Sequence, residues 1–97
     1  MLLQLPTDEL ILTELQHGRN LGANIADEID RHNKTVTKRL IQLEDYSLVE
    51  NIGRGVYEIT PQGEIALKHI DEYDRDSDQL AEIIGAEIDR IGNSNNV

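Results

Sequence analysis

The first 45 residues carry apolar side chains at the spacing of three successive amphipathic helices. These helices are predicted at about residues 8–17, 22–29 and 33–45. Thr7 is the expected N-cap of the first helix, because a threonine hydroxyl can accept a hydrogen bond from an early backbone N–H. In the third helix, Val36, Leu40 and Leu43 form the stripe that we expect to be buried. A turn at 30–32 separates this helix from the second.

Between about residues 48 and 59 the pattern changes to two short strands with a glycine-rich turn between them. The sequence Gly53-Arg54-Gly55 is typical of a tight hairpin turn, because glycine permits the positive φ that such turns require. A new helix is predicted to follow the hairpin. Thr60 can cap it, and Pro61 suits its first position because proline has no N–H to lose there.

The last third of the chain, from residue 61 to about residue 91, has helical spacing throughout. Its polar run at 74–78 leaves two interpretations open: an exposed segment of one long helix, or a break after which Ser77 caps a separate last helix. The apolar stripe of this last helix either packs on its own domain or pairs with a second chain, and we favour a homodimer. The predicted dimer interface consists of Leu80, Ile83, Ile84, Ile88 and Ile91.

The chain is strongly acidic as a whole, but its charge is unevenly distributed. Its 19 acidic and 9 basic residues give a net charge of −10, which by itself argues against a phosphate-rich partner. Residues 31–57, however, hold five basic and three acidic side chains and form the only net positive stretch. The acidic, lysine-poor composition without Phe or Trp is typical of organisms with high internal salt, where charge is screened within a few ångström. We therefore expect a halophilic protein.

Several classes of site are not predicted. The absence of cysteine excludes disulfides and cysteine-based zinc sites, and the histidines at 17, 32 and 69 lack metal-ligand spacing. The sequence has no nucleophile–base pair and no glycine-rich phosphate loop followed by lysine, so we expect neither an enzyme nor a cofactor. No small-molecule effector site can be identified. No apolar run approaches the roughly 20 residues of a membrane span, and the expected location is the cytoplasm.

Residues 33–45 combine an apolar stripe with small and polar side chains on the other faces. A helix of this kind can enter the major groove of DNA, which is about 12 Å wide. The candidate DNA contacts on this helix and on the hairpin are Asn33, Lys34, Thr35, Lys38, Arg39, Gln42 and Arg54. Among them, Arg39 is expected to bind phosphate, and Arg54 to reach the DNA backbone or the narrow minor groove.

These helices and the hairpin resemble the winged helix-turn-helix regulators of bacteria and archaea. The matching segments are Ile25-Ala26-Asp27-Glu28-Ile29, Lys34 to Glu44, and Leu48 to Gly63 with its Thr60-Pro61-Gln62-Gly63 end. The broad relatives are the MarR-like and ArsR-like repressors, and the acidic composition adds a similarity to small phage-repressor-like winged-helix proteins of haloarchaea. The resemblance covers about residues 7–76. The turn departs from the family pattern, because Asp30 and Arg31 stand where a glycine and an aliphatic residue are common, and this could bring Arg31 near a phosphate.

The resemblance implies a mainly α fold with a small β-hairpin wing (α+β). Residues 1–76 would form the winged helix-turn-helix DNA-binding domain, and residues 77–97 a C-terminal dimerisation helix with a frayed tail. It further implies an archaeal transcriptional regulator, expected to be a repressor, that binds double-stranded DNA sequence-specifically. The alternative is a winged-helix protein–protein interaction module without direct DNA readout. That alternative gains support if Glu44, Asp45 and Glu50 interleave with the basic residues.

Overall fold

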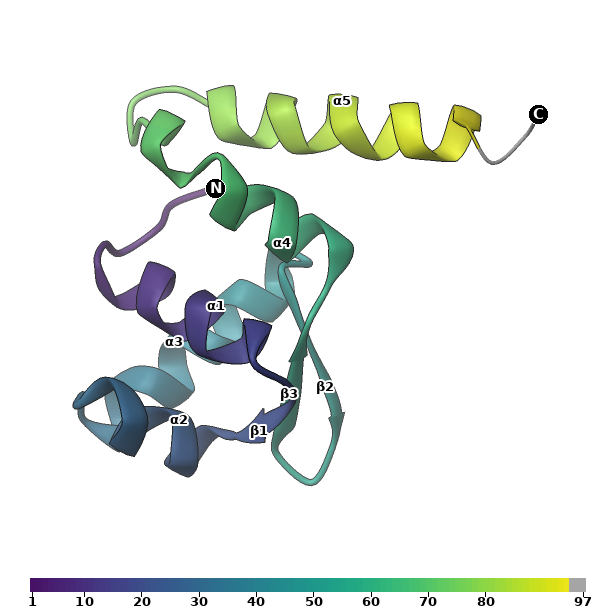
Figure 1. The fold of residues 1–97 in the computed structure, drawn as a ribbon. Coiled ribbons are helices and arrows are strands. Elements are labelled where there is room, and N and C mark those ends of the chain that lie inside the picture. The colour runs from purple at the N-terminus through teal and green to yellow at the C-terminus, as the bar shows by residue number, and fades with distance from the viewer. Residues whose placement is uncertain (95–97) are drawn as a thin grey trace.

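Residues 1–94 are the part of the chain that the computed structural model describes, and they form a mainly helical α+β fold with a small antiparallel sheet (Figure 1). The elements in chain order are α1 (Thr7–Gln16), β1 (Asn20–Leu21), α2 (Gly22–Ile29), α3 (Asn33–Asp45), β2 (Val49–Gly53), β3 (Val56–Ile59), α4 (Pro61–Lys68), the 3-10 turn η1 (Ile70–Glu72) and α5 (Gln79–Ser94). The predicted α+β class is confirmed. The end of the predicted frayed tail, residues 95–97, lies outside the described residues.

The helices α2 and α3 and the strand β3 have the predicted bounds. Helix α4 begins as predicted, with the Thr60 hydroxyl accepting a hydrogen bond from the Gly63 N–H at 3.0 Å. The predicted cap of α1 is wrong, because Thr7 already belongs to the helix and no side chain caps the helix at the residue before it. The buried carboxylate of Asp8 in the first turn instead accepts a hydrogen bond from the Gln4 N–H at 2.7 Å.

The three strands pair antiparallel in the order β1-β3-β2. Strand β1, which the sequence did not predict, is two residues long and pairs Asn20 with Tyr57 along the second edge of β3. The turn between β2 and β3 consists of Arg54 and Gly55, with φ of 54° and 75°. Positive φ at both central residues is the type I′ geometry, whose twist matches that of the strands it joins. The hairpin turn predicted at this position is therefore confirmed.

A break separates α4 from α5, as the second interpretation of the C-terminal segment proposed. Helix α4 ends at Lys68, η1 follows, and α5 begins only at Gln79, whose N–H donates to the Ser77 hydroxyl at 3.4 Å. Helix α5 packs against α4 and η1 and lies across one end of the molecule. Its C-terminal half extends past the other elements (Figure 1).

The core is formed by the inner faces of the helices together with the base of the hairpin. Its most deeply buried apolar residues are Ile11, Leu12, Leu15, Ile25, Val36, Leu40, Leu43, Leu48 and Val49. The predicted stripe of α3 is thus buried, as expected. Leu80 and Ile84 join the same core and anchor the first half of α5. Within residues 1–94, no helix has the length and the apolar character needed to cross a membrane.

Helix α4 packs so closely on the start of β2 that Gly63 has no room for a side chain. A Cβ atom at this position would overlap the carbonyl oxygen of Leu48 and press against Ile59. Thr60 holds the same junction together, because its hydroxyl donates to the Ser47 carbonyl and its N–H donates to the Leu48 carbonyl. The Thr-Pro-x-Gly sequence therefore fixes where α4 leaves the hairpin.

Candidate nucleic-acid interface

A sharp turn with a left-handed residue sets the direction of α3 relative to α2. Asp30 has φ 55° and ψ 51°, a conformation that Asp and Asn adopt more readily than other non-glycine residues. The Arg31 N–H donates to the Ala26 carbonyl at 3.0 Å, which closes a Schellman motif at the end of α2. The Arg31 guanidinium folds back to 3.3 Å from the Asp30 carbonyl oxygen. The Asp-Arg pair thus still forms a tight turn, and the Arg31 side chain caps the carbonyls of α2.

The first half of α3 presents polar side chains to solvent. Asn33, Lys34, Thr35 and Lys38 are all exposed. His32 precedes them as the N-cap of α3, and its Nδ1 accepts a hydrogen bond from the Lys34 N–H at 3.2 Å. Residues four apart share a helix face, so Lys34 and Lys38 lie on the same outward face of α3.

Arg39 lies apart from this exposed set, on the side of α3 that faces α1. Its Nε and Nη2 lie 2.9 Å from the two carboxylate oxygens of Asp8, which is fully buried. Its Nη2 also donates to the Leu2 carbonyl at 3.2 Å. The hydrogen bonds with Asp8 raise the pKa of Arg39. Because its guanidinium is engaged inside the chain, we correct the sequence-based set and remove Arg39 from the candidate DNA contacts.

The carboxylates of α3 and of the hairpin lie at the other end of α3 and at the base of the hairpin, whereas Asp27, Glu28 and Asp30 are exposed on α2 and in the turn that leads into α3. Glu44 and Asp45 are exposed in the last turn of α3, about 9–17 Å along the helix axis from the two lysines at a rise of 1.5 Å per residue. Glu44 Oε2 accepts a hydrogen bond from the Asn51 N–H at 2.9 Å. Glu50 faces Glu58 across the hairpin, and both are exposed. The cations and the carboxylates are therefore separated along α3.

Two shallow hollows between α3 and the hairpin mark these two ends. We call the hollow beside the hairpin turn the turn hollow. Its lining includes Asn33 and Thr37 of α3 and Gly55 of the β2–β3 turn. The hollow at the base of the hairpin includes the carboxylates Glu44 and Glu50. Uncharged polar residues from the first half of α3 thus line the turn hollow, and Glu44 at the acidic end of α3 lines the other.

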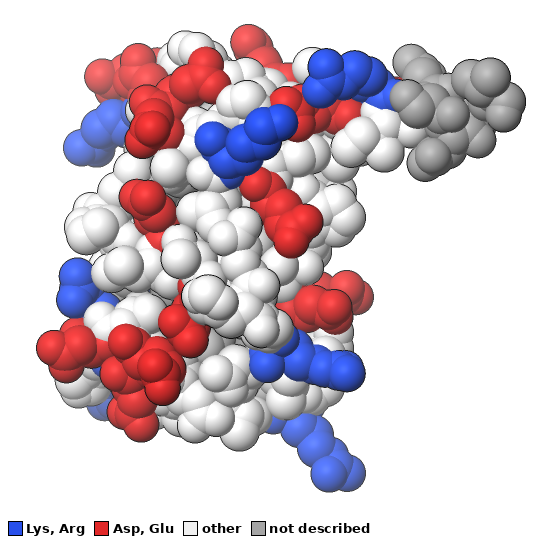
Figure 2. All heavy atoms as spheres, in the orientation of Figure 1, with Lys and Arg blue, Asp and Glu red and all other residues white. Residues whose placement is uncertain are grey.

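Arg54 stands at the tip of the hairpin, exposed to solvent and in a left-handed backbone conformation. It adjoins Gly55, which lines the turn hollow. Figure 2 shows blue side chains projecting from the end of the molecule where the hairpin turn lies, while red side chains gather over α2 and around α4 and α5. A cation therefore marks the hairpin side of the turn hollow.

The structure changes the membership of this surface in two further ways. Gln42, a predicted contact, is half-buried. Thr37 and Ile41, which were not among the predicted contacts, are exposed on α3, and Ile41 has 53% of its surface accessible. The sequence contains a signal for Ile41, because this apolar residue falls outside the stripe at 36, 40 and 43.

No match to this chain is found among protein family models, curated proteins or solved structures. Its function must therefore be argued from its own residues. Since one fold can host many activities, the chemistry of the surface has to decide between them.

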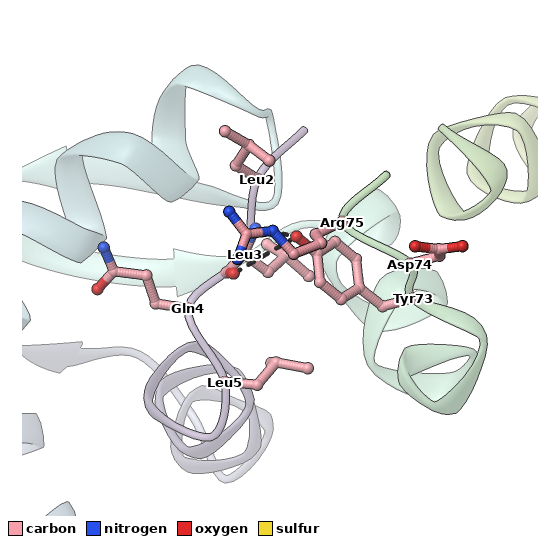
Figure 3. Close-up of a pocket in the computed structure, with 7 residues that line it drawn as sticks. All are labelled: Leu2, Leu3, Gln4, Leu5, Tyr73, Asp74 and Arg75. Atoms are coloured by element: carbon pink, nitrogen blue, oxygen red, sulfur yellow. Dashed lines mark hydrogen bonds between the residues drawn. The ribbon is translucent and has the colours of Figure 1, made fainter. Parts of the chain in front are cut away.

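A third hollow, of about 690 Å³, lies between the N-terminal residues 2–5 and residues 73–75 (Figure 3). The Tyr73 hydroxyl points to the N-terminal segment and accepts a hydrogen bond from the Leu3 N–H at 3.0 Å. Among the described residues, no buried polar side-chain atom lacks a hydrogen-bond partner. No buried polar side-chain atom in this hollow is therefore without a hydrogen-bond partner.

A charged cluster joins α4 and η1 to α5. His69 Nδ1 lies 2.7 Å from Glu72 Oε2, and His69 Nε2 lies 2.8 Å from Glu87 Oε1. Only a doubly protonated imidazole donates to both carboxylates. The hydrogen bond to Glu87 and, to a smaller extent, the hydrogen bond to Glu72 raise the pKa of His69. The hydrogen bond from His69 in turn lowers the pKa of Glu87. Among residues 1–94, no group of three His, Asp or Glu side chains could hold a metal ion. We call this cluster the His69 clamp.

Only part of the predicted dimer stripe is available at the surface. Leu80 and Ile84 are buried in the core of the chain itself, so we remove them from the predicted interface. Ile83 and Ile88 are half-buried. Ile91 is 48% exposed and lines a hollow together with Pro61 and Lys68 of α4.

Proposed function

We propose that this chain is a winged helix-turn-helix protein that binds double-stranded DNA sequence-specifically and represses transcription. One observation carries the proposal: exposed cations lie on the first half of α3 and on the hairpin turn, the two elements that border the turn hollow. The carboxylates that belong to α3 and the hairpin lie at the far end of α3 and at the hairpin base. A surface divided in this way offers DNA a basic end.

The arrangement of the elements supports the proposal. Helices α2 and α3 meet through a Schellman turn, and α3 buries one face while its outward face is polar. A helix with side chains is about 10–12 Å in diameter, which fits the major groove of about 12 Å. The β2–β3 hairpin follows α3 directly and would serve as the wing.

Each exposed residue has a role that its chemistry suggests. Lys34 and Lys38 can donate to O6 and N7 of guanine, and Asn33 can form a bidentate pair with adenine. Thr35, on a different face of α3 from the lysines, is suited to a phosphate. Arg54 can reach the DNA backbone or the minor groove, where a narrow groove concentrates negative potential.

The net charge of −10 determines the conditions under which this binding would occur. At low salt, the acidic surface repels DNA over a Debye length of about 10 Å. In molar salt, the screening length falls to about 3 Å, and the counterion release that favours basic proteins is also weakened. Binding would then depend on short-range contacts of α3 and of the hairpin turn, which is consistent with a protein from a high-salt cytoplasm.

We further propose that the chain acts as a homodimer through the exposed part of α5. The stripe of Ile83, Ile88 and Ile91 is what remains after the buried members are removed. A two-fold dimer would place two copies of α3 about 34 Å apart, one turn of B-DNA. Sedimentation of an Ile83→Asp, Ile91→Asp variant tests this, because Ile88 packs against the core of the chain itself, and an unchanged molecular mass would contradict it. Deleting α5 is unsuitable because it would also remove the core residues Leu80 and Ile84.

A protein-interaction module is the second candidate, and the exposed Glu44 and Glu50 favour it, because both line the hollow at the base of the hairpin. Such a module would use the acidic end of this surface and bind a basic protein partner. The two candidates therefore place the contact at opposite ends of α3, and substitutions at each end separate them.

Selection of duplexes from a random-sequence library tests DNA binding. It is carried out in about 2 M KCl, within the molar range of salt that screens charge. Fluorescence anisotropy then compares the native chain with the double variant Lys34→Gln, Lys38→Gln. Loss of the base contacts of both lysines should weaken the binding free energy by about 2 kcal/mol or more, which is roughly 30-fold in affinity. Lys68→Gln on α4 is the control, because it removes one positive charge far from α3. Failure to enrich any duplex, or equal loss in the Lys68 variant, would overturn the proposal.

The same assay at several salt concentrations tests the role of the acidic surface. We expect the affinity to change little, or to rise, as KCl increases, because screening removes the repulsion. A steep fall in affinity with added KCl, as basic repressors show, would contradict this part of the proposal.

A further inference from the structure

Ile41 is an exposed aliphatic residue in the middle of an otherwise polar helix face. It has 53% of its surface accessible, while the neighbouring Leu40 is fully buried. A single exposed aliphatic residue is common on protein surfaces and by itself needs no explanation. The position of Ile41 does need an explanation, because Lys34, Lys38 and Ile41 are spaced at i, i+4 and i+7 and so lie on one face of α3.

We propose that Ile41 reads the C5-methyl group of thymine in the major groove, an inference that rests on the proposed function. Four kinds of base edge line that groove, and the thymine methyl is its distinctive apolar group. The two lysines on the same face supply the positive charge that brings this face to DNA. The group that Ile41 contacts is therefore a thymine methyl group, in DNA that the two lysines bind.

The side chain of Ile41 suits such a contact. Isoleucine is β-branched and holds one strongly preferred χ1 rotamer in a helix, so its methyl groups keep a fixed position with little entropy left to lose. Along the axis of α3, Ile41 lies about 4.5 Å beyond Lys38 at a rise of 1.5 Å per residue. With α3 along the groove and about 3.4 Å between base pairs, the thymine would lie within one or two base pairs of the base that Lys38 contacts.

The test replaces each thymine of the selected duplex, one at a time, by deoxyuridine, which removes only the C5-methyl group. Anisotropy should show about a fourfold loss of affinity at one thymine per half-site, the equivalent of ~0.8 kcal/mol for one buried methyl group. The Ile41→Ala variant should bind the thymine duplex more weakly and should no longer distinguish thymine from uracil at that position.

Ile52→Ala is the matched control, because Ile52 is also an exposed isoleucine, at 40%, but belongs to the hairpin. It should keep the thymine preference. A thermal unfolding curve of the Ile41→Ala variant should match that of the native chain, since an exposed side chain contributes little to stability.

Two results would overturn the inference alone: a selected duplex that binds equally well with uracil at every position, or an Ile41→Ala variant that keeps the native preference for thymine. If no duplex is enriched in the selection, the proposed function itself fails and the inference falls with it. The experiment therefore distinguishes failure of the methyl contact from failure of DNA binding.

Discussion

Replacing Arg39 by methionine should destabilise the fold, although this arginine belongs to the helix proposed to read DNA. The carboxylate of Asp8 has no exposed surface and is held by two guanidinium hydrogen bonds of 2.9 Å and by the Gln4 N–H at 2.7 Å. Methionine keeps most of the apolar stem of Arg39 but removes both guanidinium bonds. A buried negative charge would then remain with a single donor.

The expected loss is large compared with the stability of a domain of this size. Breaking a buried ion pair by removing one partner costs about 3–5 kcal/mol, because the remaining charge is left uncompensated. Native domains are stable by about 5–15 kcal/mol in total. At about 4–8 °C per kcal/mol for a domain of up to 100 residues, the midpoint of thermal unfolding should fall by more than about 10 °C.

Urea unfolding followed by circular dichroism measures this loss. Lys38→Met, one residue earlier and exposed, is the control and should change the free energy of unfolding by no more than about 0.5 kcal/mol. Adding Asp8→Asn to Arg39→Met should recover part of the loss, because it removes the buried charge while keeping an acceptor for the Gln4 N–H. The reasoning is refuted if Arg39→Met costs no more than Lys38→Met. A DNA-binding defect of an Arg39 variant would therefore report on folding.

Three further predictions concern single positions. Gly63→Ala should destabilise by about 1–3 kcal/mol or more, because its Cβ would overlap the Leu48 carbonyl; an unchanged urea midpoint would refute the close packing of α4. The hydrogen bonds of the His69 clamp raise the pKa of His69. The stabilisation of the fold by protonated His69 should therefore be complete below the ordinary histidine pKa of about 6.5 and should be lost as pH rises through the raised pKa. The difference in unfolding free energy between the native chain and His69→Gln should therefore shrink at alkaline pH, and a difference independent of pH would count against the clamp. Asp30→Gly and Arg54→Gly should each raise stability by up to about 1 kcal/mol, because both positions have positive φ, but only Arg54→Gly should weaken DNA binding in the anisotropy assay.

Much of the fold could be predicted because its signals are local. The bounds of α2 and α3 follow from apolar spacing within a few turns, and the hairpin turn follows from Gly53-Arg54-Gly55. Thr60 and Pro61 mark the start of α4 for the same reason, since a cap acts on residues three positions away. Each of these features is decided by neighbours in the sequence.

The features that sequence reasoning missed depend on contacts between distant residues. Strand β1 has only two residues and exists because Asn20 meets Tyr57 in space. Arg39 seemed free for phosphate because its partner Asp8 lies 31 residues earlier in the chain. The sequence also could not show which apolar residues of α5 are buried in the core and which remain at the surface. Their spacing is the same for residues that enter the core of the chain, such as Leu80, and for those left at the surface.

Within residues 1–94, three non-glycine residues have positive φ, two of them for a structural reason and one, we argue, for a functional reason. Asp30 and Ser47 end α2 and α3, where the backbone must turn left-handed to close a Schellman motif, and short polar side chains tolerate this conformation. Arg54 occupies a type I′ turn, where Asn or Gly would be more stable. An arginine at the hairpin tip therefore costs stability without a compensating bond among the contacts of the described residues. Strained residues of this kind cluster at functional sites, and the Arg54 guanidinium at the hairpin tip is the group through which we propose that the hairpin holds DNA.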